Sequence, residues 1–363
     1  MAGKPKANEY SLANLHREFV TVAVGAVGGS LFYLLRIPGN ALSGSLIAVA
    51  ILAAMGKATP IGGILRVFAL ASVGISIGST VTPDTFHNLA AYPLSMVMMS
   101  LCVIAMTLAS AAMWRLVFRW PGPMSLLASV PGSMSYIVSV SMGLGADAAK
   151  VAVVQMSRVI FLASVLPFIV VYEAGGHYNL PELKIVDPTG IALLTLAAGI
   201  VVGAFITRLG MAGGMLLGAL ILSGVVHYLG WSPGRTPLWL FNAGQVLLGS
   251  WVGSRFVDFD WSLFGRICVG TTASVGAAMG VSVAFALLAT SLFHVSFGTA
   301  LMAYSPGGQD AMMVLALSMG VDPIFVSAHH LARYFLINAS LPFLIVWLQR
   351  REDRRKLATG EAA

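Results

Sequence analysis

Three charged residues within long apolar segments could carry chemistry in this sequence: Asp310, Arg158 and Arg333. A charge inside a lipid-spanning segment is costly and marks a functional site by default. The carboxylate of Asp310 could carry a proton or help to coordinate Na⁺, and the two guanidiniums could hold a carboxylate or another anion through paired hydrogen bonds. The alternatives are structural. Asp310 could cap a half-helix or lie in a water-exposed mouth, and the arginines could neutralise carbonyl ends or form an ion pair such as Arg333 with Asp310 or Asp322.

Two Pro-Gly interruptions precede these charges, and each falls inside an apolar run. They are Pro131-Gly132 and Pro306-Gly307. Proline removes a backbone donor and clashes with the preceding turn, and glycine lets the chain leave helical dihedrals. Freed backbone groups cannot face lipid, and the resulting half-helices offer charged ends to a solute. An ordinary proline kink is the alternative. We predict a substrate or ion site that also uses the neighbouring small and polar residues Ser133, Ser135, Gly307, Gly308 and Gln309.

The two interruptions belong to a duplication with a constant offset of 175 residues. Each is followed by Gly, then Asp, then Arg, then Leu-Pro-Phe. The offset also relates the pair Gly74 and Gly78 to the pair Gly249 and Gly253. Small residues let helices approach closely in lipid. We therefore expect a repeat that covers the whole chain, and paired broken segments of this kind are typical of secondary transporters.

The composition predicts an all-α integral membrane protein. The chain has 363 residues, 58% of them hydrophobic and 10% charged, with a mean hydropathy of +0.87. Soluble domains carry about 25% charged residues. The apolar runs of about 15–25 residues are too long for barrel strands. The net charge of +7 sits mostly at the ends and in short loops, so it is no nucleic-acid footprint. The predicted segments cover 20–35, 41–55, 62–79, 92–113, 124–145, 148–172, 189–207, 211–229, 238–253, 267–293, 299–319 and 324–348.

These runs divide the chain into a membrane protein of about 10–12 transmembrane segments in two tandem repeats. If every run crosses, the halves are parallel. If one per half is re-entrant, they are inverted, which the acidic linker and Arg255 and Arg266 favour through the positive-inside rule. The same rule places both termini on the cytoplasmic side. The expected location is a bacterial plasma (inner) membrane. The expected parts are the N-terminal segment 1–18, the repeats 19–172 and 189–348, the linker 173–188 and the basic tail 349–363.

The remaining polar residues predict little further chemistry. Asp147 and Asp322 each precede a helix closely and are expected to cap it. Gln155 and the pair His329-His330 fall within one helical turn of the arginines and could add hydrogen bonds or a proton relay, although adjacent histidines point to different helix faces. No metal site, cofactor or catalytic motif is predicted, and the protein is not expected to be an enzyme.

The duplicated motif resembles the AbrB-type membrane protein family, whose members carry an internal AbrB duplication. The resemblance covers about residues 15–350, and Ser133 departs from the fuller Pro-Gly-Gly form of the motif. Family members are often labelled ammonia monooxygenases or transcriptional regulators, with regulation of gene expression as the attached process. The family is also distantly similar to the cation:proton antiporter and anion transporter superfamily, which implies inverted five-helix repeats with paired broken helices.

Neither label fits as a direct mechanism. A DNA-binding regulator needs a soluble readout module, and only residues 1–18 and about 349–363 lie outside the predicted membrane part. A copper enzyme needs clustered histidines, which the sequence lacks. We predict a secondary transporter of a small, anionic or zwitterionic solute coupled to H⁺ or Na⁺, with a membrane-embedded ligand sensor as the alternative. The expected partners are the solute or ion and the lipid bilayer but no nucleic acid, and homodimerisation stays open.

Overall fold

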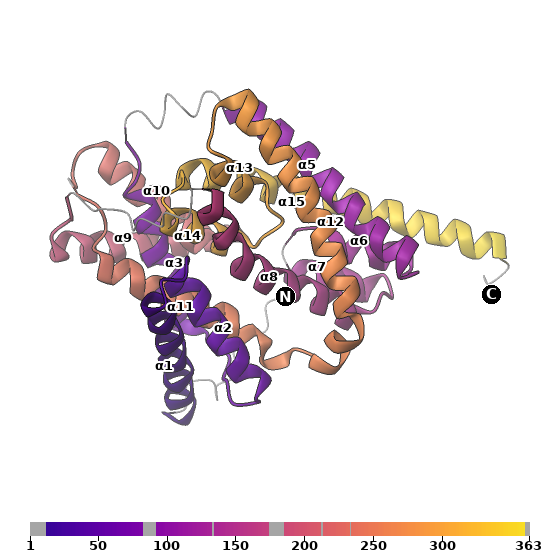
Figure 1. Cartoon of the computed structure of the whole chain (residues 1–363), viewed down its shortest axis with the longest axis horizontal. Helices are drawn as coiled ribbons and strands as arrows, with labels where there is room; N and C mark the ends of the chain where they lie inside the picture. Colours follow the sequence, from indigo (N-terminus) through magenta and orange to yellow (C-terminus); the bar gives the residue numbers. More distant parts are fainter. Residues whose placement is uncertain are drawn as a thin grey trace. The chain divides into compact units, whose positions relative to one another are not determined.

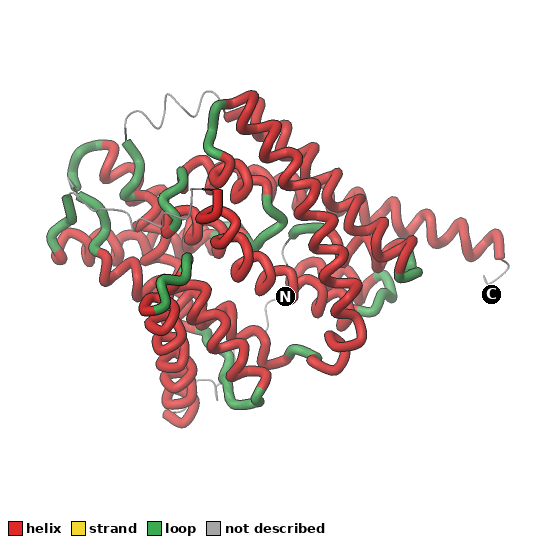
Figure 2. Tube along the Cα trace, viewed as in Figure 1, coloured by secondary structure: helices red, strands yellow, loops and turns green. Residues whose placement is uncertain are grey.

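The computed structural model describes residues 12–82, 92–132, 134–173, 185–211, 213–232 and 234–359, and these are helices joined by short loops (Figures 1 and 2). Within these ranges the one β-type pairing is an isolated bridge between Val186 and Arg235. The protein is therefore all-α, as the sequence predicted. The chain forms two compact units, each assembled from separate stretches of sequence.

Unit 1 comprises Met1–Asn88, Ala163–Phe259 and Asp310–Ile324. In it α2 contacts α1 and α11, and α10 contacts α3 and α9. A small core of Ala71, Ile75, Ala192, Leu196, Ala219 and Leu240 joins four of these helices. Its helices are α1 (Leu12–Leu34), α2 (Asn40–Ala54), α3 (Gly63–Gly78), α9 (Thr189–Arg208), α10 (Gly214–Tyr228), α11 (Leu238–Ser254), the 3₁₀ turn η2 (Arg255–Asp258) and nearly all of α14 (Gln309–Ser318).

Four glycines set the close approach of helices in unit 1. A Cβ added at Gly74 or Gly78 would lie under 3.0 Å from a backbone oxygen of α10. A Cβ added at Gly249 or Gly253 would lie equally close to a backbone oxygen of α2. Real Cβ atoms do not tolerate such a separation, so these helices pack backbone to backbone. The prediction of close helix approach at Gly74 and Gly78 is confirmed, and the equivalent pair Gly249 and Gly253 allows the same approach in the second half.

Unit 2 comprises Leu89–Leu162, Asp260–Gln309 and Phe325–Ala363, so α8, α14 and α15 each cross the unit boundary. In it α12 packs against α5 and α13, and α5 also contacts α6. Its helices are α5 (Tyr92–Ala112) with the π-helical turn η1 (Met113–Val117), α6 (Gly122–Ser129), α7 (Met134–Gly143), the first part of α8 (Ala148–Glu173), α12 (Trp261–Phe293), α13 (Phe297–Tyr304) and most of α15 (Pro323–Thr359).

Five helices in the described ranges are long and apolar enough to cross a membrane. Three shorter apolar helices accompany them, namely α2, α3 and α10. The chain is thus an integral membrane protein. The number of crossings and the inverted arrangement of the halves stay predictions. The five candidate spans are His16–Leu34, Tyr92–Val117, Ala148–Glu173, Thr189–Arg208 and Trp261–Phe293.

The observed helices match the predicted segments closely in the interior of the chain and less well at its ends. Both predicted broken segments are divided, into α6 with α7 and into α13 with α14. The last helix does not stop at 348, because α15 continues through the basic stretch to Thr359. Charged Lys, Arg and Glu residues are good helix formers, so the helix has no local reason to end there. Most of the predicted linker, residues 174–184, lies outside the described residues.

Candidate functional site

The second helix break is a buried turn in unit 2 that exposes backbone carbonyls to one guanidinium. Helix α13 ends at Tyr304, Ser305 is extended, and α14 begins at Gln309. Arg333 of α15 donates from Nη1 to the Ser305 carbonyl at 2.6 Å and from Nη2 to the Gly307 carbonyl at 2.6 Å. Buried carbonyls without a helical partner need such donors. The guanidinium therefore stabilises the break.

The first break, also in unit 2, is held by a pair of side chains. Helix α6 ends at Ser129, and its carbonyl accepts a bond from Arg158 Nη1 at 3.2 Å. Gln155 donates from Nε2 to the carbonyls of Leu127 and Val130, each at 2.9 Å. The Gln155 amide oxygen in turn accepts from Arg158 Nη2. Two residues of α8 thus satisfy the carbonyl end of α6.

One side-chain hydrogen bond to a backbone carbonyl recurs at equivalent positions of both breaks, with a different donor residue in each half. His330 Nε2 donates to the Met302 carbonyl at 3.0 Å, and Gln155 Nε2 bonds the Leu127 carbonyl in the first half. Donor and acceptor are both displaced by 175 residues between the halves. Since a carbonyl only accepts, His330 carries its proton on Nε2. The neighbouring His329 faces elsewhere and bonds the Ser95 hydroxyl, so the two histidines serve different places.

Capping aspartates set the register that brings both arginines to the breaks. Asp147 Oδ1 accepts the Lys150 N–H at 3.1 Å at the start of α8, and Asp322 Oδ1 accepts the Ile324 N–H at 2.9 Å at the start of α15. Each helix then places its arginine eleven residues after the cap. The capping prediction is confirmed by both bonds.

The two breaks come together through their guanidiniums. Arg158 and Arg333 are 7% and 4% exposed, and they interact electrostatically with one another. Such like-charge proximity is compensated by the negative carbonyl ends of α6 and α13. Some buried polar atoms stay open: Arg158 Nε, His330 Nδ1 and Gln309 Nε2 have no hydrogen-bond partner in the described part of the chain. The region around the breaks therefore keeps polar groups that a small solute could satisfy.

The predicted small polar contacts are described only in part. Ser133 lies outside the described residues, and so does the side chain of Ser135. Gly308 has open space where a side chain would be, with Val159 at 4.0 Å from an added Cβ. Gly307 is engaged through its carbonyl. A binding role for these residues stays a prediction.

Asp310 begins the stretch of α14 that belongs to unit 1, and its surroundings differ from those predicted. Its carboxylate interacts electrostatically with Arg255 and Arg66 of the same unit. The guanidiniums of both arginines lie over the ring of Trp251, at 4.0 Å and 4.8 Å from the ring centroid. Arg333, by contrast, donates hydrogen bonds from Nη1 and Nη2 to two carbonyls. Sequence reasoning did not assemble this Trp-centred cluster, because Arg66 and Asp310 are far in the chain from Trp251 and Arg255.

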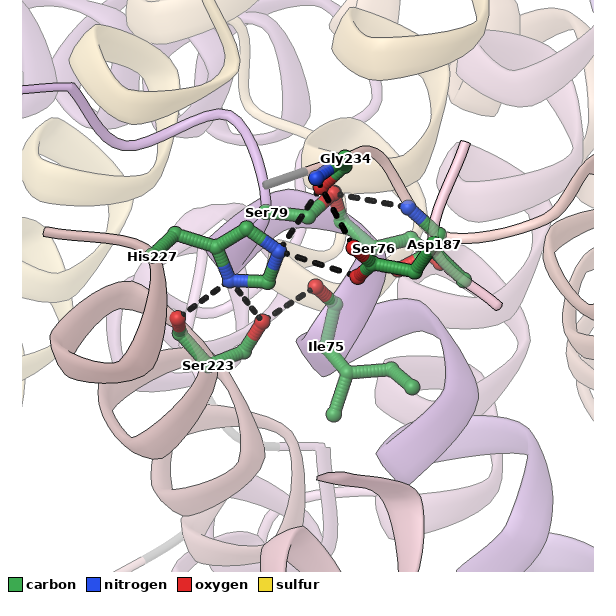
Figure 3. A network of polar contacts seen from close by, with 8 residues as sticks. Ile75, Ser76, Ser79, Asp187, Ser223, His227 and Gly234 are labelled. Atoms are coloured by element: carbon green, nitrogen blue, oxygen red, sulfur yellow. Dashed lines mark hydrogen bonds and ion pairs between the residues drawn. The ribbon is translucent and has the colours of Figure 1, made fainter. Parts of the chain in front are cut away.

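Sequence reasoning also missed a second polar network of unit 1 (Figure 3). His227 Nε2 lies 2.9 Å from the Gly234 carbonyl and 3.3 Å from Asp187 Oδ2, and Nδ1 lies 2.7 Å from the Ser223 carbonyl. Asp187 Oδ1 accepts the Gly234 N–H at 2.8 Å. Both ring nitrogens therefore face acceptors. The topology prediction treats Asp187 as a linker charge, but it is 5% exposed and belongs to this network.

No group of three or more histidine, cysteine or acidic side chains in the described ranges has a geometry suited to a metal ion.

Known sequences resemble this chain over most of its length. The sequence model of a family described as "Transition state regulatory protein AbrB" matches residues 42–349. The "Uncharacterized protein YhjN" of Bacillus subtilis (strain 168) is 27% identical over 386 residues, covering 96% of this chain and 99% of that protein. The "Putative regulator AbrB" of Escherichia coli (strain K12) is 26% identical over 340 residues, covering 89% and 94%. Neither relative is named as an enzyme.

Proposed function

This chain belongs to the AbrB family, and from that premise we propose that it is a secondary transporter of a small anionic or zwitterionic solute driven by H⁺ or Na⁺. The names of the family and of one relative speak of regulation. The chain itself is a helical membrane protein, and five helices within its described ranges are suited to spanning a bilayer. A regulatory effect of such a molecule would follow from the level of a solute.

The observation that carries the proposal is the pair of helix breaks in one unit, each held by a buried arginine. Interrupted helices with free backbone ends form solute sites in transporters. Here the carbonyl ends are held by Arg158 and Arg333, and three buried polar atoms near them have no partner within the described ranges. A purely structural break would account for the two buried cations, because they satisfy its carbonyls, but not for the buried polar atoms beside them that have no partner in the described ranges.

In this proposal Asp310 couples the solute to an ion. It is a carboxylate at the end of the second break, and the first half has Ser135 at the equivalent position. Arg158 and Arg333 keep the break regions positive, and Gln309 offers an amide to the solute. We further propose a bacterial inner-membrane location with both termini in the cytoplasm.

The test is uptake by proteoliposomes that contain the purified full chain. Small carboxylates and amino acids are screened with an imposed pH or Na⁺ gradient. Asp310→Asn is expected to abolish dependence on the driving ion, whereas Asp258→Asn, which changes an exposed acid of unit 1, leaves uptake unchanged. Uptake and ion dependence that survive Asp310→Asn would refute the coupling role. Labelling of single cysteines in 173–188 from the cytoplasmic side would refute the inverted topology.

A membrane-embedded ligand sensor is the second candidate, favoured by the name of the Escherichia coli relative. A sensor would show a solute-dependent shift in melting temperature without uptake. It would also retain a soluble partner on the basic end of α15. Uptake above that of empty liposomes decides for the transporter.

A further inference from the structure

An exposed pair of arginines in unit 1 has the chemistry of an anion site. Arg66 stands in the first turn of α3, and Arg255 follows the end of α11. Both guanidiniums lie over Trp251, a residue of α11 that is 6% exposed. The π-system of the indole attracts both cations. The two guanidiniums also interact electrostatically with each other, so two like charges lie near one another around Trp251.

The donors of this pair are uncommitted. In the described part of the chain neither guanidinium has a hydrogen bond or ion pair to a protein group. Each guanidinium presents five N–H donors in a planar fork that matches an oxyanion. The N-terminal turn of α3 has no side-chain cap, so its positive end adds to the same field. The arginines at the helix breaks differ, because their donors are used by carbonyls.

Asp310 is the acidic residue that acts on this pair. Its carboxylate interacts electrostatically with Arg255 and Arg66, which are the charged groups that face it. No ion pair within 4.0 Å joins them in the described ranges. A charged Asp310 therefore weakens the field felt by an incoming anion and repels that anion. A neutral Asp310 does neither.

We propose that Arg66 and Arg255, docked on Trp251, form a subsite for a small oxyanion, a carboxylate or a phosphate, and that protonation of Asp310 strengthens its binding. The inference rests on the proposed function in one respect only, namely that the bound anion is the transported solute. It makes H⁺ the coupling ion, because proton and anion then bind together. Removing the acid at position 310 is therefore expected to raise anion affinity. The opposite change would be expected if Asp310 were a simple counter-charge for the arginines.

The test measures anion binding to the purified full chain in detergent by thermal shift. Succinate and, separately, inorganic phosphate are titrated between pH 5.5 and 8.5 at constant chloride. At each pH the wild type is compared with Asp310→Asn on the same probe, which cancels the titration of the probe itself. Relative to this variant, wild-type affinity is expected to fall as pH rises, until Asp310→Asn binds about tenfold more tightly than wild type at pH 8.5. Arg66→Gln and Arg255→Gln should each weaken binding about tenfold, the loss of one charge-assisted contact. The two probes decide between carboxylate and phosphate.

Arg208→Gln is the matched control, because Arg208 is an exposed arginine of the same unit at the end of α9. It should bind as wild type does. Trp251→Phe keeps an aromatic face and should retain most of the affinity. Four results would each overturn the subsite. They are an equal loss of affinity in Arg208→Gln, unchanged binding in both Arg66→Gln and Arg255→Gln, weaker binding by Asp310→Asn, and no binding of either probe at pH 5.5. Anion binding without uptake would support the subsite and refute transport. Uptake together with normal anion binding by the arginine variants would support transport and refute the subsite.

Discussion

Replacing Asp187 by alanine should destabilise unit 1 strongly, because this carboxylate completes a buried network. The side chains of Asp187 and His227 are 3% and 6% exposed. Both nitrogens of His227 face carbonyl or carboxylate oxygens, and the Ser223 hydroxyl near Nδ1 is already donated to the Ile75 carbonyl at 2.8 Å. Asp187 Oδ2 lies 3.3 Å from Nε2, so the ring and the carboxylate form a buried pair whose polar atoms all face protein partners.

The magnitude follows from two interactions that the substitution removes. Removing one partner of a buried ion pair costs about 3–5 kcal/mol, and the orphaned N–H of Gly234 adds about 1 kcal/mol. For a chain of this size the melting temperature should fall by roughly 10 °C. Asp187→Asn keeps one acceptor oxygen and should fall about half as far. Asp258→Ala, which removes an exposed acid of unit 1, should stay within about 0.5 kcal/mol of wild type.

The assay is thermal denaturation of the purified protein in one detergent, monitored by tryptophan fluorescence for the single variants and for Asp187→Ala combined with His227→Leu. The double variant should lose less stability than the two singles together, by about 1–3 kcal/mol, since each single already breaks the shared pair. Strictly additive losses would mean that the two side chains do not interact. An Asp187→Ala variant as stable as Asp258→Ala would show that the network contributes nothing.

Three further variants test the structure, with stability measured by the same thermal assay and uptake measured in proteoliposomes. Gly78→Ala should destabilise by about 1–3 kcal/mol because its Cβ meets a backbone oxygen of α10, whereas Gly276→Ala, with open space around it, should be neutral or slightly stabilising. Arg333→Lys keeps the charge but loses one of two bonds at the second break, so it should cost about 1.5–3 kcal/mol and abolish uptake. Asp147→Ala should cost about 1 kcal/mol at pH 7. Burial raises the pKa of Asp147, but the hydrogen bonds and charge of Lys150 outweigh this effect and lower the pKa below the ordinary carboxyl value. The stabilisation by Asp147 is therefore fully present above the ordinary carboxyl pKa. The destabilisation caused by Asp147→Ala should vanish as pH falls through the lowered pKa.

Local chemistry in the sequence predicted the breaks and the caps. A Pro-Gly pair in an apolar run favours a helix end through local sterics, and an Asp just before a helix caps it. Both broken segments and both capping bonds are therefore found where the residues indicated. The predicted approach of helices at Gly74 and Gly78 follows from the same local cause, the missing side chain.

The partners of the charged residues depended on tertiary structure. Sequence reasoning left two readings open for Arg333, the carbonyl ends of the broken helices and an ion pair with Asp310 or Asp322. The structure has the first, because carbonyls of the second break accept from its guanidinium. Asp310 faces Arg255 and Arg66, which stand 55 and 244 residues away in the chain.

The sequence by itself determined that this is a helical membrane protein with one broken segment in each half of the chain, because hydropathy, Pro-Gly pairs and caps act over a few residues. The fold alone decided which cation meets which oxygen. Electrostatic and hydrogen-bond partners are chosen by distance in space, and the 175-residue offset carries no information about distances between the stretches that form each unit.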